Sequence, residues 1–173
     1  MLLLPSIRDL FGHMEWADAG LWKVALATPA AGDDVFLREK LHHLHMVQRS
    51  FFLIWHDEDP RAAANLTFEE LPALARWGRE YHAGAATYLG KLDDATLVRV
   101  IALPWASRFA GEGRPIGPVT LGETLLQVAL HSVNHRGQLL VRLRELGAAP
   151  PTLDYIMWLW LGRPRPDWPP ASA

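Results

Sequence analysis

Residues 120–146, with the sequence TLGETLLQVALHSVNHRGQLLVRLREL, restrict the fold more than any other part of this chain. Thr120 precedes Glu123 by three residues, which is the spacing of a capping box at a helix N-terminus. Apolar residues then recur at close to the helical period, and Gly147 follows as a residue that readily ends a helix. The pattern predicts one long helix with a buried apolar face.

Two histidines, His131 and His135, interrupt this apolar face near its middle. Their spacing of four residues places them one turn apart on the same side of the helix. An imidazole that faces a protein core needs either hydrogen-bond partners or a metal ion. The spacing alone leaves both alternatives open.

The same periodicity predicts three further helices, over residues 6–27, from 33 or 34 to 56, and over 67–91. Thr67 and Glu70 form a second capping-box pattern, although Pro72 favours a start nearer Glu69 or Glu70. Beyond these helices we expect a small hairpin within residues 98–119, a short apolar helix over 152–161, and a loosely ordered proline-rich tail over 162–173. The chain is therefore expected to form a single all-α domain over residues 1–173, a four-helix bundle with a hairpin-like insertion before the fourth helix.

Composition and charge exclude several classes of protein. The chain has no cysteine, which rules out disulfides, thiolate ligands and a cysteine nucleophile, and which is compatible with a reducing cytoplasm. Its net charge of −2 and its lack of a dense basic cluster argue against nucleic-acid binding. Its start has no basic region typical of a signal peptide, and no apolar run reaches the roughly 18 residues of a membrane span. We therefore expect a cytoplasmic protein with neither a membrane nor a nucleic-acid partner.

A third histidine, His43, lies in the predicted second helix on the same stripe as Val47, whereas its neighbours His42 and His45 are expected to point elsewhere. Metal sites in helical bundles use inward-facing side chains from adjacent helices. Three neutral imidazoles suit zinc, nickel, copper or iron(II), and three protein ligands leave positions open for water or substrate. His43 and the histidine pair of the 120–146 helix are thus candidate ligands of a catalytic type of site.

Other catalytic motifs do not match. The residues between the paired histidines are Ser132, Val133 and Asn134, so the pattern is not the HExxH of a zinc protease. A di-iron bundle needs two ExxH motifs, and only Glu39 to His42 fits one. The chain also contains no GxSxG elbow and no phosphate-binding glycine pattern. A three-histidine centre is the remaining candidate.

Three segments resemble the DinB/YfiT-like family. The segment HSVNHRGQLLVRLRELGAAPPTLDYIMWL is similar to that family's HxxxHRGQ helix and the chain that follows it. In LHHLHMVQRSFFLIW, the residues His43, Leu44 and Gln48 match its second-helix motif, and HMEWADAGLWKVAL resembles its first helix. The resemblance extends over nearly the whole chain, and the histidine-bearing helix is its most specific part.

This resemblance implies an up-down-down-up four-helix bundle, usually dimeric, with a divalent metal held by His43, His131 and His135. Zinc or nickel is the expected metal, with iron or manganese as alternatives. Relatives include transferases and isomerases that use small-molecule thiols, while many have no assigned reaction. We therefore expect a cytoplasmic, homodimeric, metal-dependent enzyme, either a thiol-dependent transferase or isomerase or a hydrolase. The alternatives are a non-catalytic metal- or ligand-binding stress-response protein, and a structural dimer whose histidines are hydrogen-bonded core residues.

The chain departs from the family pattern near the proposed site. Gln127 and Asn134 occupy positions where many relatives carry further histidines, and Asp18 replaces a frequent asparagine. Whether these three residues surround the metal is left open, with a hydrogen-bonded buried carboxylate as the simpler interpretation of Asp18.

Three neighbours of the histidine pair are interpreted as structural. Arg136 and Gln138 match the family motif, and we expect them to form polar contacts that tie helices together. Gly137 is expected to allow close approach of another helix, because glycine inside a helix is otherwise unfavourable.

Overall fold

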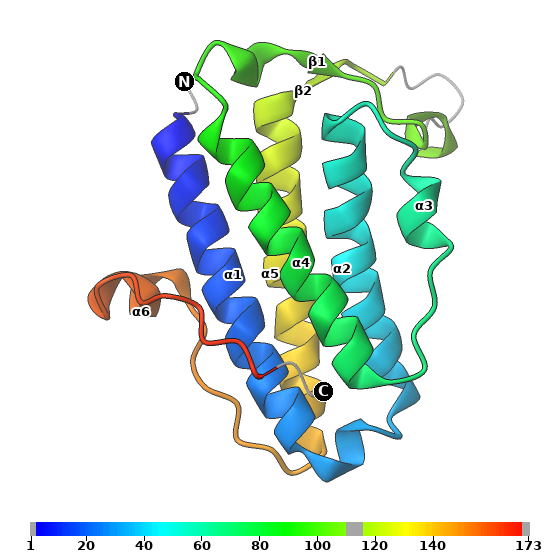
Figure 1. The fold of residues 1–173 in the computed structure, drawn as a ribbon, viewed down its shortest axis with the longest axis vertical. Helices are drawn as coiled ribbons and strands as arrows, with labels where there is room; N and C mark the ends of the chain where they lie inside the picture. The colour runs from blue at the N-terminus through cyan, green and yellow to red at the C-terminus, as the bar shows by residue number, and fades with distance from the viewer. Residues whose placement is uncertain (1–2, 110–115, 171–173) are drawn as a thin grey trace.

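A computed structural model describes residues 3–109 and 116–170 of the chain. Most of these residues belong to four long helices, α1 (Leu4–Ala27), α2 (Val35–Trp55), α4 (Leu71–Gly90) and α5 (Leu121–Glu145). In Figure 1, α1 and α5 run down while α2 and α4 run up, and the short helix α3 (Arg61–Ala64) lies on the crossover between α2 and α4. The predicted all-α fold with up-down-down-up topology is confirmed.

Short elements complete the described chain. The predicted hairpin reduces to two residues on each side, with β1 (Val100–Ile101) antiparallel to β2 (Val119–Thr120). Part of the glycine- and proline-rich segment that follows β1 lies outside the described residues. The remaining elements are the 3-10 turns η1 (Pro29–Ala31), η2 (Thr96–Val98) and η3 (Ala106–Phe109), and helix α6 (Tyr155–Trp160).

The helix ends show where local sequence signals succeed and fail. The capping box of α5 is confirmed, because the Glu123 amide donates to Thr120 Oγ1 (3.3 Å) and the Thr120 amide donates to Glu123 Oε2 (2.7 Å). The capping box predicted for α4 is wrong, because the helix has no side-chain cap, but the later start that Pro72 favoured is confirmed, since the helix begins directly after Glu70. Helix α1 begins before the predicted cap at Ser6, because a distant residue, Asp94, accepts from the amide of Leu4 (2.8 Å).

The helices pack so that α1 and α2 each contact both α4 and α5. Two apolar clusters fill the interior, one around Trp22, Leu41 and Leu139 and the other around Met14 and Leu125. Buried polar residues lie at or next to the boundary between the two clusters on every long helix: Asp18 on α1, His45 and Gln48 on α2, His82 on α4, and Ser132 and Arg136 on α5. The bundle core is therefore interrupted by one polar level.

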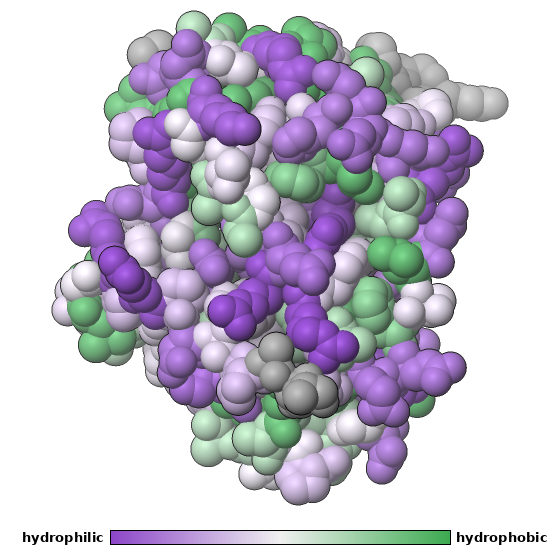
Figure 2. Space-filling view, in the orientation of Figure 1, coloured by the Kyte–Doolittle hydropathy of each residue, from purple (hydrophilic) through white to green (hydrophobic). Residues whose placement is uncertain are grey.

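The C-terminal segment is more ordered than its composition predicts. It runs back over α1 (Figure 1), where Trp168 Nε1 donates to Glu15 Oε1 at 3.2 Å and Lys23 pairs with Asp167. The expectation of a loosely ordered tail is thus wrong up to residue 170. On the face drawn in Figure 2, hydrophilic side chains alternate with hydrophobic ones. No helix in the described part of the chain is long and apolar enough to cross a membrane.

Candidate metal centre

The structure brings the three predicted histidines together. His43 on α2 faces His131 and His135 on α5, and one ring nitrogen of each lies within 4.8 Å of the others. The ring centroids are 4.3 Å apart for His131 and His135, and 4.7 Å apart for His43 and His135. We refer to these three residues as the histidine triad. Their convergence agrees with the sequence-based expectation, while their role as metal ligands stays a prediction.

The nitrogens of the triad are available to a ligand. His131 Nε2 is buried and has no hydrogen-bond partner among the described residues. His135 Nδ1 lies 3.1 Å from Gln138 Oε1, an arrangement that leaves Nε2 of His135 as the nitrogen with a free lone pair. Gln138 was expected to tie helices together, and it instead contacts a triad ring. Hydrogen bonding of this kind fixes the tautomer of metal-bound histidines.

Electrostatics keep the triad neutral. Burial, together with the nearby His135 and His43, lowers the pKa of His131 to about 4. Burial also lowers the pKa values of His43 and His135, and Lys40 contributes to both. The three imidazoles are therefore unprotonated at neutral pH, which is the form that binds metal.

The donor set fits a divalent transition metal. Nitrogen ligands at ~2.0 Å from a tetrahedral ion lie ~3.4 Å apart, so small rotations of the side chains would close the observed spacing. Imidazole is a good ligand for zinc, nickel, copper and iron(II), and three such ligands leave part of the coordination sphere open. The centre is thus compatible with a divalent metal whose identity the geometry leaves open.

A large cavity of about 1240 Å³ adjoins His43 and His131. One wall is apolar and includes Phe51 and Trp105, whose rings meet edge to face at 5.3 Å. Charged residues from the segment 57–61, together with Arg108, also line it. Gln127 also lines this cavity, whereas Asn134 is exposed and does not line it. His43 and His131 therefore border a space large enough for a small molecule.

A second cluster of potential ligands, Asp18, His45 and His82, is buried. Its ligand atoms also lie within 4.8 Å of one another. The sequence-based expectation that His45 points away from the interior is wrong, because His45 is fully buried while His43 is only half-buried. Its ring packs against α4 at Gly78, where an added Cβ would lie 2.5 Å from His45 Nε2.

Hydrogen bonds occupy both nitrogens of His45. Trp22 Nε1 donates to His45 Nε2 (2.8 Å), so His45 Nδ1 must carry the proton that is donated to Gln48 Oε1 (2.7 Å). Gln48 Nε2 in turn donates to Asp18 Oδ2 (2.9 Å) and to Ser132 Oγ (3.0 Å). The Trp22 indole, which can only donate, therefore fixes which group donates and which accepts in this series of hydrogen bonds.

The Asp18 carboxylate receives two further donors. His82 Nε2 lies 3.0 Å from Asp18 Oδ2, and the Arg136 guanidinium forms an ion pair with Oδ1. Burial alone would raise the pKa of Asp18, but Arg136 and the hydrogen bond from His82 hold it well below its usual range. Burial lowers the pKa of His45 to about 4, so this ring is neutral.

We call Trp22, His45, Gln48, Asp18, His82, Ser132 and Arg136 the buried network. Its ligand atoms are already engaged, which makes it a structural core and not a metal site.

The sequence reasoning found part of this network. It anticipated a hydrogen-bonded Asp18 and a helix-tying Arg136, and both are confirmed by their ion pair. It missed His45 and His82, for which Gly78 was the available signal. The prediction for Gly137 is wrong, because an added Cβ there would meet nothing within 4 Å among the described residues.

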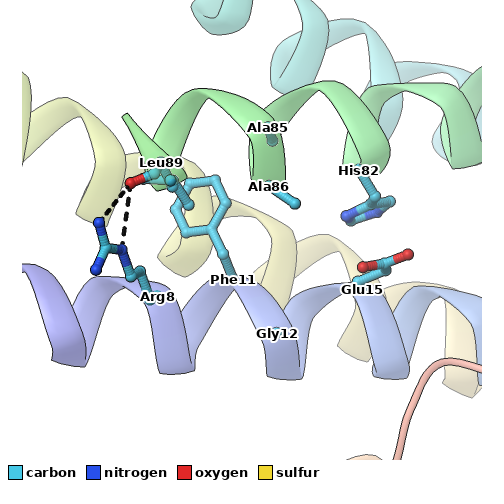
Figure 3. A pocket seen from close by; sticks show the side chains of 9 residues that line it. Arg8, Phe11, Gly12, Glu15, His82, Ala85, Ala86 and Leu89 are labelled. Atoms are coloured by element: carbon cyan, nitrogen blue, oxygen red, sulfur yellow. Dashed lines mark hydrogen bonds between the residues drawn. The ribbon is translucent and has the colours of Figure 1, made fainter. Parts of the chain in front are cut away.

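A smaller cleft of about 200 Å³ lies between α1 and α4 (Figure 3). Phe11 and the small residues of α4 line its middle, and Arg8 closes one end by donating to the Leu89 carbonyl (2.9 Å). Glu15 and His82 face each other at the other end. Both are engaged elsewhere, Glu15 by Trp168 and His82 by the buried network. The histidine triad lies between the other pair of helices, α2 and α5.

An up-down-down-up bundle with three converging imidazoles and an adjoining cavity defines a helical protein compatible with divalent-metal binding. The chain matches the family model described as "DinB family" over residues 9–166, and it belongs to that family. It matches no curated protein and no solved structure in the comparisons made.

Proposed function

We propose that this DinB-family protein is a divalent-metal-dependent enzyme whose metal is held by His43, His131 and His135. The observation that supports this most directly is the convergence of three neutral imidazoles beside a large cavity, one of them with a buried nitrogen that has no partner among the described residues. A bound ion would supply Lewis acidity and lower the pKa of a coordinated water or thiol. Zinc or nickel is our first expectation, with iron or manganese as alternatives.

The residues of this chain would bind and orient the substrate. The Phe51–Trp105 wall would hold an apolar part of the molecule, and the charged residues that line the cavity would hold its polar part. Gln138 would keep His135 in the tautomer that presents Nε2. Family relatives that use small-molecule thiols make a thiol-dependent transfer or isomerisation our preferred reaction, with hydrolysis as the alternative.

We also propose a cytoplasmic, single-domain protein that forms a homodimer through α5. Leu130, Val133 and Val141 are 65%, 53% and 53% exposed, and their spacing places them along one side of that helix. Light scattering should give twice the monomer mass for the parent and a lower mass for Val133→Glu. A monomeric parent would contradict the dimer and leave the metal site untouched.

Metal analysis of protein purified without an affinity tag tests the metal centre. We expect close to one divalent ion per chain, and a rise in melting temperature on adding zinc or nickel to metal-free protein. His131→Ala should abolish this rise, whereas His56→Ala, at an exposed position outside the triad, should preserve it.

A metal content near zero that stays unchanged after incubation with zinc or nickel would contradict the proposal. Metal binding without turnover of any thiol–acceptor pair or hydrolysable substrate would instead favour a non-catalytic metal-binding stress-response protein.

A further inference from the structure

The histidine triad is assembled from two helices, and little holds its rings individually. Of the three rings, that of His135 alone has a hydrogen-bond partner among residues 3–109 and 116–170. The position of His43 relative to the α5 pair therefore depends on how α2 is seated against α5.

Gln48 provides a direct polar link between these two helices. Its Nε2 donates to Ser132 Oγ on α5 (3.0 Å) and to Asp18 Oδ2 on α1 (2.9 Å), which uses both amide protons. Its Oε1 accepts from His45 Nδ1 (2.7 Å), one turn earlier on α2. Because all of these groups are buried, the amide has no water to replace a lost partner, and its orientation is fixed.

The link lies close to the triad along both helices. Ser132 follows His131 directly and Arg136 follows His135, so on α5 each triad residue is adjacent to a residue of the buried network. On α2, Gln48 lies five residues after His43. The side chains of the network are buried in the bundle, while His43 and His131 are half-buried and line the cavity.

We infer that Gln48 and Ser132 are positioning residues for the histidine triad, because their hydrogen bond sets the seating of α2 against α5 where the three imidazoles converge. This inference rests on the proposed metal site. It gives the buried network a role in binding affinity in addition to its role in folding. Arg136 and Asp18 anchor the same level to α1, so a change in the link cannot be absorbed by sliding α5.

Cobalt(II) titration of metal-free protein at 25 °C tests this, since the visible absorption of the bound ion reports both affinity and coordination geometry. Gln48→Met keeps the chain length and removes the amide, and Ser132→Ala removes only the hydroxyl. We expect each to weaken cobalt binding by about 10-fold or more and to change the absorption bands. Ser132→Thr retains a hydroxyl and should bind cobalt close to the parent affinity.

Leu74→Ala is the matched control for a general loss of stability. Leu74 is fully buried on α4 and lies outside both the triad and the network, so this variant should melt at a lower temperature yet bind cobalt like the parent. Circular dichroism at the titration temperature verifies that each variant is folded. If Gln48→Met does not fold, Ser132→Ala decides the question.

Parental affinity and an unchanged spectrum in Gln48→Met or in Ser132→Ala would overturn the positioning role while leaving the metal site in place. A parent that binds no cobalt would overturn the proposed metal site itself, and the positioning role with it.

Discussion

The histidine triad and the cluster of Asp18, His45 and His82 both bring potential ligand atoms close together. They differ in whether those atoms are free to bind a metal. Each brings three potential ligand atoms within 4.8 Å of one another. In the triad, the His131 nitrogen has no partner among the described residues and the cavity lies alongside. In the buried cluster, Trp22 occupies His45 while Arg136 pairs with Asp18. A group of ligand residues is therefore a candidate metal centre only when its lone pairs are free.

The physical reason is competition. A metal entering the buried cluster would have to displace an ion pair and several enclosed hydrogen bonds, and each group left unpaired in the interior carries a desolvation penalty. A metal entering the triad would meet neutral rings whose lowered pKa values have already removed competition by protons. We accordingly expect the network to matter most for folding and the triad most for binding.

The largest expected effect on folding comes from removing the cation of the buried network. Arg136→Met leaves the buried Asp18 with its hydrogen bonds to Gln48 and His82 but without its guanidinium partner, which should lower the free energy of unfolding by about 3–5 kcal/mol. Arg142→Met removes a partly exposed partner of Asp34 and should lower the free energy of unfolding much less. Urea denaturation at pH 7 measures both. Equal losses of stability in the two variants would contradict the claim that the buried ion pair contributes more than the partly exposed one.

The next effect is a pH dependence that originates in His45. Its pKa is about 4 in the folded protein against an ordinary 6.5, so between these values the unfolded chain binds a proton that the folded chain does not. The free energy of unfolding should therefore fall as the pH drops from 6.5 to 4, by about 3 kcal/mol from this residue. His45→Gln does not titrate and should show a correspondingly flatter profile in urea denaturation. Parallel profiles for parent and variant would show that His45 is not buried in its neutral form.

Two glycines on different helices sharpen the comparison further. An added Cβ at Gly78 would collide with His45, so Gly78→Ala should destabilise the protein by about 1–3 kcal/mol. Gly137, beside the triad on α5, has open space around it, and Gly137→Ala should stabilise the helix by up to about 1 kcal/mol. Thermal denaturation should show shifts of opposite sign. A stabilising Gly78→Ala would mean that the network tolerates displacement of its imidazole.

The smallest expected effect on folding belongs to the triad. His43 is half-buried and has no hydrogen bond among the described residues, so His43→Ala should change the stability of the metal-free protein by less than ~1 kcal/mol. The same variant should lose the stabilisation that added zinc or nickel gives the parent. Chemical denaturation with and without metal measures both quantities. A loss near that of Arg136→Met in the metal-free protein would place His43 in the folding core.

Sequence patterns predicted much of this arrangement where the signal is local. The capping box at Thr120 fixed the start of α5, and helical spacing placed His131 and His135 on one side of it. The prediction of a loosely ordered tail failed because Trp168 and Asp167 contact partners on α1, more than a hundred residues earlier in the chain. The predicted orientation of His45 was wrong for a related reason. A helical wheel orders residues by angle, but α2 contacts both α4 and α5, and this widens its buried side.

The sequence by itself determined the helices, the family and the three histidines of the candidate centre, because each depends on periodicity, capping or a short motif. The tertiary structure decided which histidines keep a free lone pair. That property depends on whether Trp22, Gln48 or Gln138 reaches a given ring nitrogen. The Trp22 contact depends on how the helices pack, and the Gln48 contact depends on how its buried amide is held. Availability for metal is set by packing, which residue spacing alone does not specify.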